Sequence, residues 1–301
     1  MVKILIIGGS GVVGSKLVEY FNYLKKNVEF TYNTNKTKFP NGHYLDITQK
    51  KHTIELIEKI NPDIIIHTAA LTNVDLCETN NKLAHMINVK GTENILEGCK
   101  NVGGKIVFIS TSFVFDGQKM EYFEDDQTSP STFYGVTKFN AEQLVIKSKL
   151  PFLILRIDQP YCWNESWQHT NSVLRVLESL QSKKILNEIS DWYNTPTYVP
   201  DFVDATEKLI EKDFSGIFHI VGPDFINRYK WALIVAEIFN LDKNLIHPIT
   251  SKTLNLPTVR SNVNLKNLKL KTLGIDMKNI RAGALDMLKF KTKQNIHNDT
   301  K

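Results

Sequence analysis

Short apolar, β-branched runs alternate with longer amphipathic segments along the first half of the chain. Because these runs are mostly apolar, we predict strands covered on both faces at Val2–Ile7, Val28–Tyr32, Ile64–His67, Lys105–Ser110 and Phe152–Arg156. The amphipathic segments predict helices at Val12–Lys25, Thr48–Ile60, Asn81–Lys100 and Thr132–Lys147. This alternation is typical of βαβ units and predicts an α/β fold with a doubly wound parallel sheet.

The pattern loosens after residue 157, where aromatic residues and prolines interrupt polar stretches such as QPYCWNESWQHTN and SDWYNTPTYVPDF. Helices are predicted there at Ser172–Gln181, Phe202–Lys212 and Arg228–Phe239. We therefore expect a dinucleotide-type sheet domain over residues 1–157 and a smaller, mostly substrate-binding lobe over residues 158–290, with segments that return to the sheet. Residues 291–301 are expected to form a basic, disordered tail.

Composition excludes several classes of partner. The formal charge of +5 is mild and part of it lies in the tail, so nucleic-acid binding is not expected. Cys77, Cys99 and Cys162 lack CxxC spacing and the histidines form no HxH or HExxH cluster, so neither disulfides nor a metal site are predicted. A reducing, cytoplasmic setting fits this cysteine usage. The opening MVKILIIGG is too short to cross a membrane and is interpreted as a strand.

A glycine turn, GGSGVVG, follows the first predicted strand and precedes a helix. Gly8, Gly11 and Gly14 would let a pyrophosphate approach the backbone N–H groups at the helix N-terminus, which is the Rossmann type of dinucleotide site. A purely structural tight turn is the alternative. The predicted contacts of the turn also include Ser10, Val12 and Val13.

The second strand ends in TYNTNKTKF, without the acidic residue that usually binds the adenosine ribose. Asn33 and Lys36 suit a 2′-phosphate better, so NADPH is favoured over NADH, although a solvated Lys36 is compatible with either. Asp46 could contact the adenine amino group, and Thr48 could cap the following helix.

Tyr134 and Lys138 are four residues apart and would share one face of a helix. A neighbouring ammonium would lower the tyrosine pKa and make the phenol a proton donor. The hydroxyls of Ser110, Thr111 and Ser112 fall at the end of a parallel strand, where α/β sheets bind ligands. The alternative is an ordinary surface pair.

With these motifs, the sequence resembles the extended short-chain dehydrogenases/reductases, and within them the dTDP-4-dehydrorhamnose reductase group. The resemblance rests on the segments GGSGVVG, HTAALTNVDLCE, INVKGTENI, STSFVFDG, YGVTKFNAE and DWYNTPTYVPDFVDA. It implies that Thr111, Tyr134 and Lys138 are catalytic. It also implies cofactor contacts from Ile47, Ala69, Ala70 and Leu71, and a supporting role for Asn88.

Departures from the family pattern fall on the substrate side. Ser112 and Phe113 replace an Asp-Tyr pair, Asp158 and Gln159 replace a Ser-Trp pair, and the segment around Arg260 is degraded. The expected substrate-binding residues are Thr72, Ser112, Phe113, Gln159, Trp192 and Arg260. Trp163, Trp167 and Trp192 fit either the core of the lobe or a platform for a base.

The resemblance implies NADPH-dependent reduction of the 4-keto group of a nucleotide-linked deoxysugar. A nucleotide-sugar epimerase or dehydratase is one alternative. A non-catalytic, NADP-binding regulatory subunit like the β subunit of methionine adenosyltransferase is another. A homodimer is left open.

Overall fold

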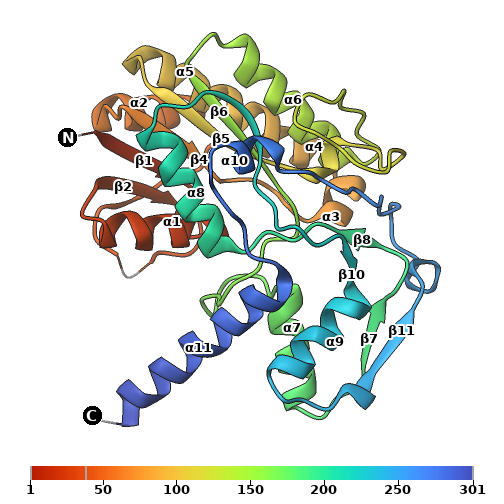
Figure 1. The fold of residues 1–301 in the computed structure, drawn as a ribbon. Helices are drawn as coiled ribbons and strands as arrows, with labels where there is room; N and C mark the ends of the chain where they lie inside the picture. The colour runs from red at the N-terminus through yellow and green to blue at the C-terminus, as the bar shows by residue number, and fades with distance from the viewer. Residues whose placement is uncertain (1, 38, 300–301) are drawn as a thin grey trace.

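The computed structural model describes residues 2–37 and 39–299, with side chains through residue 291. Its centre is a parallel sheet of seven strands in the order β3-β2-β1-β4-β5-β6-β9 (Figure 1). The strands are β1 (Lys3–Ile7), β2 (Asn27–Tyr32), β3 (Gly42–Tyr44), β4 (Ile64–His67), β5 (Lys105–Thr111), β6 (Phe152–Ile157) and β9 (Gly216–His219). The order reverses between β1 and β4, so the predicted doubly wound sheet is confirmed.

Helices cover both faces of this sheet, because its strands are apolar on both sides. One face packs on α1 (Val12–Tyr23), α8 (Val199–Glu211) and α10 (Leu268–Thr272). The opposite face packs on α2 (Lys50–Ile60), α5 (Gly91–Val102) and α6 (Phe133–Lys147). Each layer is a separate apolar core, and together they fix the edge of the sheet where the strands end.

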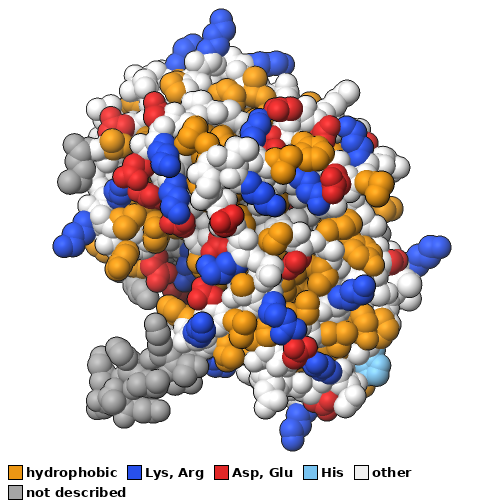
Figure 2. Space-filling model, viewed as in Figure 1, with side chains coloured by type: hydrophobic (Ala, Val, Ile, Leu, Met, Phe, Trp, Pro, Cys, Tyr) orange, Lys and Arg blue, Asp and Glu red, His pale blue; other side chains and the backbone are white. Residues whose placement is uncertain are grey.

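A smaller lobe lies beyond that edge (Figure 1 and Figure 2), and it has its own apolar core. Its helices are α7 (Ser172–Gln181), α9 (Arg228–Ile238) and α11 (Ile280–Asp299). Its short strands pair as β7 (Leu186–Ile189) with β11 (Ile246–Ile249), and β8 (Tyr193–Asn194) with β10 (Ile226–Asn227). Short 3-10 turns lie at Ser112–Val114, Lys243–Leu245 and Ser251–Leu254.

The chain returns from the lobe to the sheet after residue 157. Strand β9 pairs in parallel with β6, and α8 packs in the same layer as α1. Segments that follow residue 157 in the sequence therefore belong in space to the sheet domain as well as to the small lobe. The boundary at residue 291 falls within α11, and residues 300–301 lie outside the described residues.

The helix predicted at Asn81–Lys100 contains a change of winding. It consists of α4 (Asn81–His85), a π-helical turn over Met86–Lys90, and α5, and a short α3 (Val74–Thr79) precedes it. Asn88 lies inside the π turn. Single π turns occur frequently at functional sites.

Helix α6 is tied to the sheet by a buried ion pair. Arg156 on β6 donates to both carboxylate oxygens of Glu142, through Nε at 3.0 Å and Nη2 at 2.8 Å. Both side chains are at most 3% exposed. The pair fixes the helix that carries Tyr134 and Lys138 against the strand beside it.

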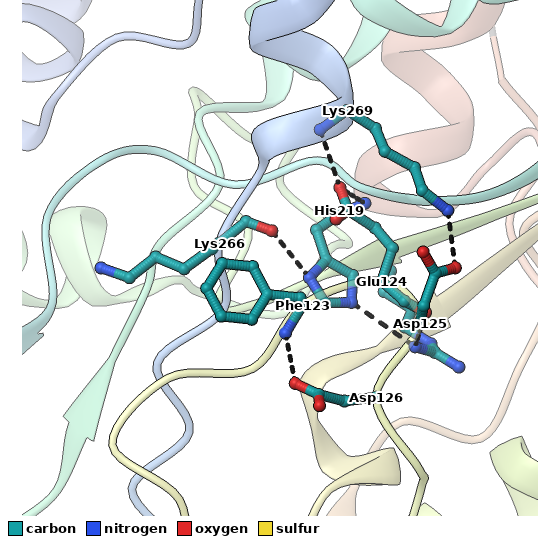
Figure 3. A network of polar contacts seen from close by, with 8 residues as sticks. Phe123, Glu124, Asp125, Asp126, His219, Lys266 and Lys269 are labelled. Carbon is teal, nitrogen blue, oxygen red and sulfur yellow. Dashed lines mark hydrogen bonds and ion pairs between the residues drawn. The ribbon is translucent and has the colours of Figure 1, made fainter.

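Arg156 Nη1 also donates to the Glu124 carbonyl oxygen at 3.4 Å, and Figure 3 shows the polar contacts around Glu124 and His219. Glu124 is buried and accepts long hydrogen bonds from the backbone N–H groups of His219 and Lys269, at 3.5 and 3.4 Å. Burial raises the pKa of its carboxyl. The His219 ring contacts the Lys266 carbonyl oxygen at 2.9 Å, so the loop, β9 and the segment before α10 are joined.

Candidate active site

The glycine turn has the close backbone approaches that its sequence predicts. A Cβ on Gly8, whose φ is +89°, would lie 2.7 Å from the backbone nitrogen of Ala69, and one on Gly14 would clash with the Gly8 carbonyl oxygen. Gly11 is the N-cap of α1 and no side chain caps it. The first N–H groups of α1, at Val12, Val13 and Gly14, are therefore available to an anion.

The loop after β4 is held beside this turn. The backbone N–H of Ala69 donates to the Ile7 carbonyl at 3.1 Å. Asn88 holds Leu71 from both sides: its Oδ1 accepts from the Leu71 N–H at 2.7 Å and its Nδ2 donates to the Leu71 carbonyl at 3.1 Å. Ala70 is half-buried between them and Thr72 is exposed. The buried amide of Asn88 thus fixes the backbone of the loop that is predicted to contact the cofactor.

Thr111, Tyr134 and Lys138 meet at the ends of β5 and α6, and all three are buried. The Thr111 side chain lies close enough to the Tyr134 hydroxyl to favour the ionised phenol and so to lower its pKa. Phe113 packs edge-on against the tyrosine ring, with centroids 5.5 Å apart. Lys138 Nζ donates to the Ile109 carbonyl oxygen at 2.7 Å and lies 4.0 Å from the centroid of the Phe108 ring.

The expected lowering of the Tyr134 pKa is wrong for this structure. Burial raises the pKa of Tyr134 above its usual range, and the hydrogen bond from Thr111 offsets only part of this. The Lys138 ammonium is turned toward the Ile109 carbonyl, and burial lowers the pKa of Lys138 to about 7. Desolvation dominates both pKa shifts, and neither group contributes to the shift of the other, so the interaction on which the expectation relied does not operate here.

The adenosine side of the predicted cofactor site is more open. Asn33 and Lys36 are exposed, and Asn33 Nδ2 donates to the Leu45 carbonyl at 3.4 Å. Asp46 accepts from both the N–H and the hydroxyl of Thr48, at 2.9 and 2.7 Å. Helix α2 begins at Lys50, so the expectation that Thr48 caps it is wrong. Ile47 is buried against α5.

The substrate side is built on a buried carboxyl. Asp158 accepts from the Ser112 hydroxyl at 2.9 Å and from the Thr195 N–H at 2.8 Å. Burial raises its pKa to about 6. Asp158 thereby joins the end of β6 to the residue that follows Thr111.

Two guanidinium groups lie within 6 Å of the centre of one indole ring near this carboxyl. Arg228 lies 4.8 Å from the centroid of the Trp192 ring and donates to Gln159 Oε1 at 2.7 Å. Arg260 lies 5.9 Å from the same ring and pairs with Asp75 at 2.7 Å. Gln159 has a positive φ of 38°, an unusual conformation for this residue type.

Sequence reasoning missed Arg228, because it begins an ordinary amphipathic helix far from every motif. Its Nε is buried and has no hydrogen-bond partner.

Trp163 belongs to the core of the lobe, with Nε1 donating to the Met287 carbonyl at 2.9 Å. His67 contacts Thr92 at 3.0 Å, and burial lowers its pKa to about 3, which fits a packed neutral ring.

A glycine turn after β1 and a Thr-Tyr-Lys group at the end of β5, both on a doubly wound sheet, are features of the extended short-chain dehydrogenases/reductases. Residues 2–292 match the model described as the RmlD substrate binding domain, and the chain belongs to this family. No described helix has both the length and the apolar character that a membrane span requires.

Three relatives illustrate the range of this family. Methionine adenosyltransferase 2 subunit beta of Mus musculus is 29% identical over 281 residues, covering 91% of this chain and 83% of the relative. The dTDP-4-dehydrorhamnose reductase of Aggregatibacter actinomycetemcomitans is 28% identical, covering 79% of each. The crystal structure of dTDP-4-dehydrorhamnose reductase from Bacillus anthracis in complex with NADP has a TM-score of 0.85 at 25% identity, covering 96% of this chain and 99% of the other.

Proposed function

We propose that this protein reduces the 4-keto group of a nucleotide-linked deoxysugar with NADPH. The observation that carries the proposal is the buried hydroxyl pair of Thr111 and Tyr134 at the edge where the parallel strands end. A carbonyl placed there would meet two hydroxyl groups in a site shielded from water. Such groups stabilise the charge that develops on a carbonyl oxygen.

The glycine turn fits a dinucleotide, because Gly8 and Gly14 leave no room for a Cβ and α1 starts without a side-chain cap. The turn would hold the pyrophosphate, and Asn33 and Lys36 would hold a 2′-phosphate. NADH remains a possible second cofactor. When bound, the reduced nicotinamide supplies the hydride.

Each buried residue then has one role in the proton transfer. Tyr134 is a neutral phenol at physiological pH, the form that a proton donor needs, although its raised pKa makes it a weaker acid than a free tyrosine. Thr111 orients the substrate oxygen and the phenol. Burial lowers the pKa of Lys138 to about 7, so a large fraction of this side chain carries a positive charge near neutral pH. In this form it would bind the cofactor ribose.

The small lobe would bind the nucleotide part of the substrate. Arg228 and Arg260 place positive charge close to the Trp192 ring, which suits a diphosphate with an adjoining base. Gln159 orients Arg228. The sugar would then lie near Asp158 and Ser112. The sugar itself differs from 4-dehydrorhamnose in this proposal, because the family pattern is altered at these positions.

The test is a reductase assay with purified protein, NADPH, and dTDP-, UDP- and GDP-linked 4-keto-6-deoxysugars. Loss of nicotinamide absorbance reports turnover. Tyr134→Phe should lower turnover about 100-fold or more while NADPH still binds, since a placed acid contributes on this order. Tyr23→Phe, on an exposed side chain of α1, is the matched control. Full activity in Tyr134→Phe would refute the mechanism.

A regulatory subunit is the second candidate. It is supported by the 29% identity to the methionine adenosyltransferase β subunit across most of both chains, together with the altered substrate-side residues Asp158 and Gln159. In this case the protein would bind the dinucleotide and a catalytic partner chain. No turnover with any sugar in the panel, combined with co-purification of a synthetase-like enzyme, would favour this candidate.

A further inference from the structure

A loop of the small lobe reaches across to the glycine turn. This loop, residues 163–170, lies between β6 and α7, and we call it the strap. Gln168 Nε2 donates to the Ser10 carbonyl and to the Ser15 hydroxyl, both at 3.0 Å. Trp167 Nε1 donates to the same Ser10 carbonyl at 3.3 Å. Side chains more than 150 residues away in sequence therefore contact the turn between Gly8 and Gly14.

The strap is itself a defined structure. Gln168 Oε1 accepts from the Glu165 N–H at 3.0 Å, so the same amide that contacts the turn also closes the strap. Asn164 Nδ2 donates to the His169 carbonyl at 2.6 Å. At the end of the strap, Asn171 caps α7 and donates to the Cys162 carbonyl at 2.7 Å. The contact with the turn thus comes from a loop that is anchored at both ends.

These bonds restrict the part of the turn that precedes α1. The Ser10 carbonyl and the Gly11 N–H belong to one planar peptide. The strap holds its oxygen, while its N–H donates to the Gly8 carbonyl at 3.0 Å. Ser15, the second point of contact, donates to the Val12 carbonyl at 3.2 Å in the first turn of the helix. The strap therefore fixes both the peptide before the helix and the first helical turn.

We propose that Trp167 and Gln168 are positioning residues of the dinucleotide site, which hold the glycine turn in the shape that binds a pyrophosphate. This inference rests on the dinucleotide binding in the proposed function. A turn ordered before binding gives tighter binding, because less conformational entropy is lost when the ligand binds. The contact also makes dinucleotide affinity depend on the small lobe.

The variants separate this role from the others at the site. Gln168→Met keeps the side-chain length and removes the amide, and Trp167→Phe removes the indole N–H but keeps an aromatic ring. Thr170→Val is the control, because Thr170 lies in the strap and contacts Glu178 rather than the turn. Binding of NADPH and of NADH to the full chain is measured by isothermal titration calorimetry, and unfolding temperatures are measured without ligand.

Gln168→Met should weaken NADPH binding about tenfold and Trp167→Phe about threefold, the range for losing the two hydrogen bonds and the one hydrogen bond that these side chains make to the turn and the first turn of α1. The same factors should apply to NADH, because the turn contacts the pyrophosphate that both share. Thr170→Val should bind normally, and the unfolding temperatures should agree within about 2 °C.

Equal NADPH affinity in Gln168→Met and the unmodified protein would overturn the positioning role of the strap and leave the proposed function intact. If Gln168→Met does not fold, the result for Trp167→Phe decides in the same way. An unmodified protein that binds no dinucleotide would overturn both proposals.

Discussion

The buried pair of Glu142 and Arg156 provides a sharp prediction about stability. In Glu142→Gln, the neutral amide oxygen can still accept one bond, but the Arg156 charge loses its only carboxylate partner among the described contacts. Its other contacts are long, at 3.4 Å to the Glu124 carbonyl and 3.5 Å to His219. Breaking a buried pair typically costs about 3 to 5 kcal/mol, and the retained bond places this variant near 3 kcal/mol.

The assay is urea unfolding at neutral pH, followed by helical circular dichroism, with the slope m compared between variants. Glu19→Gln is the matched control. It neutralises a glutamate in an exposed i,i+3 pair with Lys16, at 2.9 Å, and should change the free energy of unfolding by no more than about 0.5 kcal/mol. A loss of less than about 1 kcal/mol in Glu142→Gln, at unchanged m, would refute the reasoning.

A double replacement tests the cause of that loss. Glu142→Leu with Arg156→Met removes both charges and keeps comparable apolar volume, so it should recover part of the stability that Glu142→Gln loses. A double variant no more stable than Glu142→Gln would show that packing around α6, rather than an unpaired charge, determines the cost.

Three further predictions concern titration and cofactor choice. In the unmodified protein, the free energy of unfolding should rise as the pH increases from about 7 to 10, because the unfolded Lys138 keeps its proton in this range and the folded one has lost it. Lys138→Met should abolish this rise and should also weaken NADPH binding. In the unmodified protein, the free energy of unfolding should fall as the pH increases from about 4 to 6, because the folded Asp158 carboxyl keeps a proton that the unfolded one releases, and Asp158→Asn should abolish this fall. Urea unfolding across each pH range checks both predictions. A variant in which the free energy of unfolding changes with pH as in the unmodified protein would contradict the prediction for that residue. Lys36→Ala should narrow the preference for NADPH over NADH by about 1 kcal/mol, measured as a ratio of dissociation constants, whereas equal affinities in the unmodified protein would exclude the assigned role.

Much of the sheet could be predicted because burial on both faces leaves a direct trace in the sequence. Apolar runs located β1, β4 and β6 to within a residue of their observed bounds. Strand β9 was missed because it begins with Gly216 and its first two residues are only half-buried, so it lacks the continuous apolar run that marks β4. Helix α8 starts at Val199, three residues before the predicted start, because Pro200 is well suited to a first helical turn.

The candidate site shows where local patterns stop being informative. The motif around Tyr134 identified the residues that cluster with Thr111, but it could not give the direction of the tyrosine pKa. That direction depends on how deeply α6 is buried and on where the Lys138 ammonium points, and both are set by tertiary packing. Arg228 and Gln168 act through contacts far apart in sequence, so no spacing rule indicates them.

The π turn at Met86–Lys90 has a consequence for chain length. Such a turn behaves as an α-helix with one additional residue. Deleting Ile87 would restore regular winding, but with α4 held in place it would rotate Asn88 by about 100° relative to α4, the angle per residue of an α-helix. The amide would then no longer face Leu71, whose N–H and carbonyl it holds. A regular helix without the extra residue would therefore release the loop after β4. The π turn thus determines where this loop, on one side of the candidate site, is held.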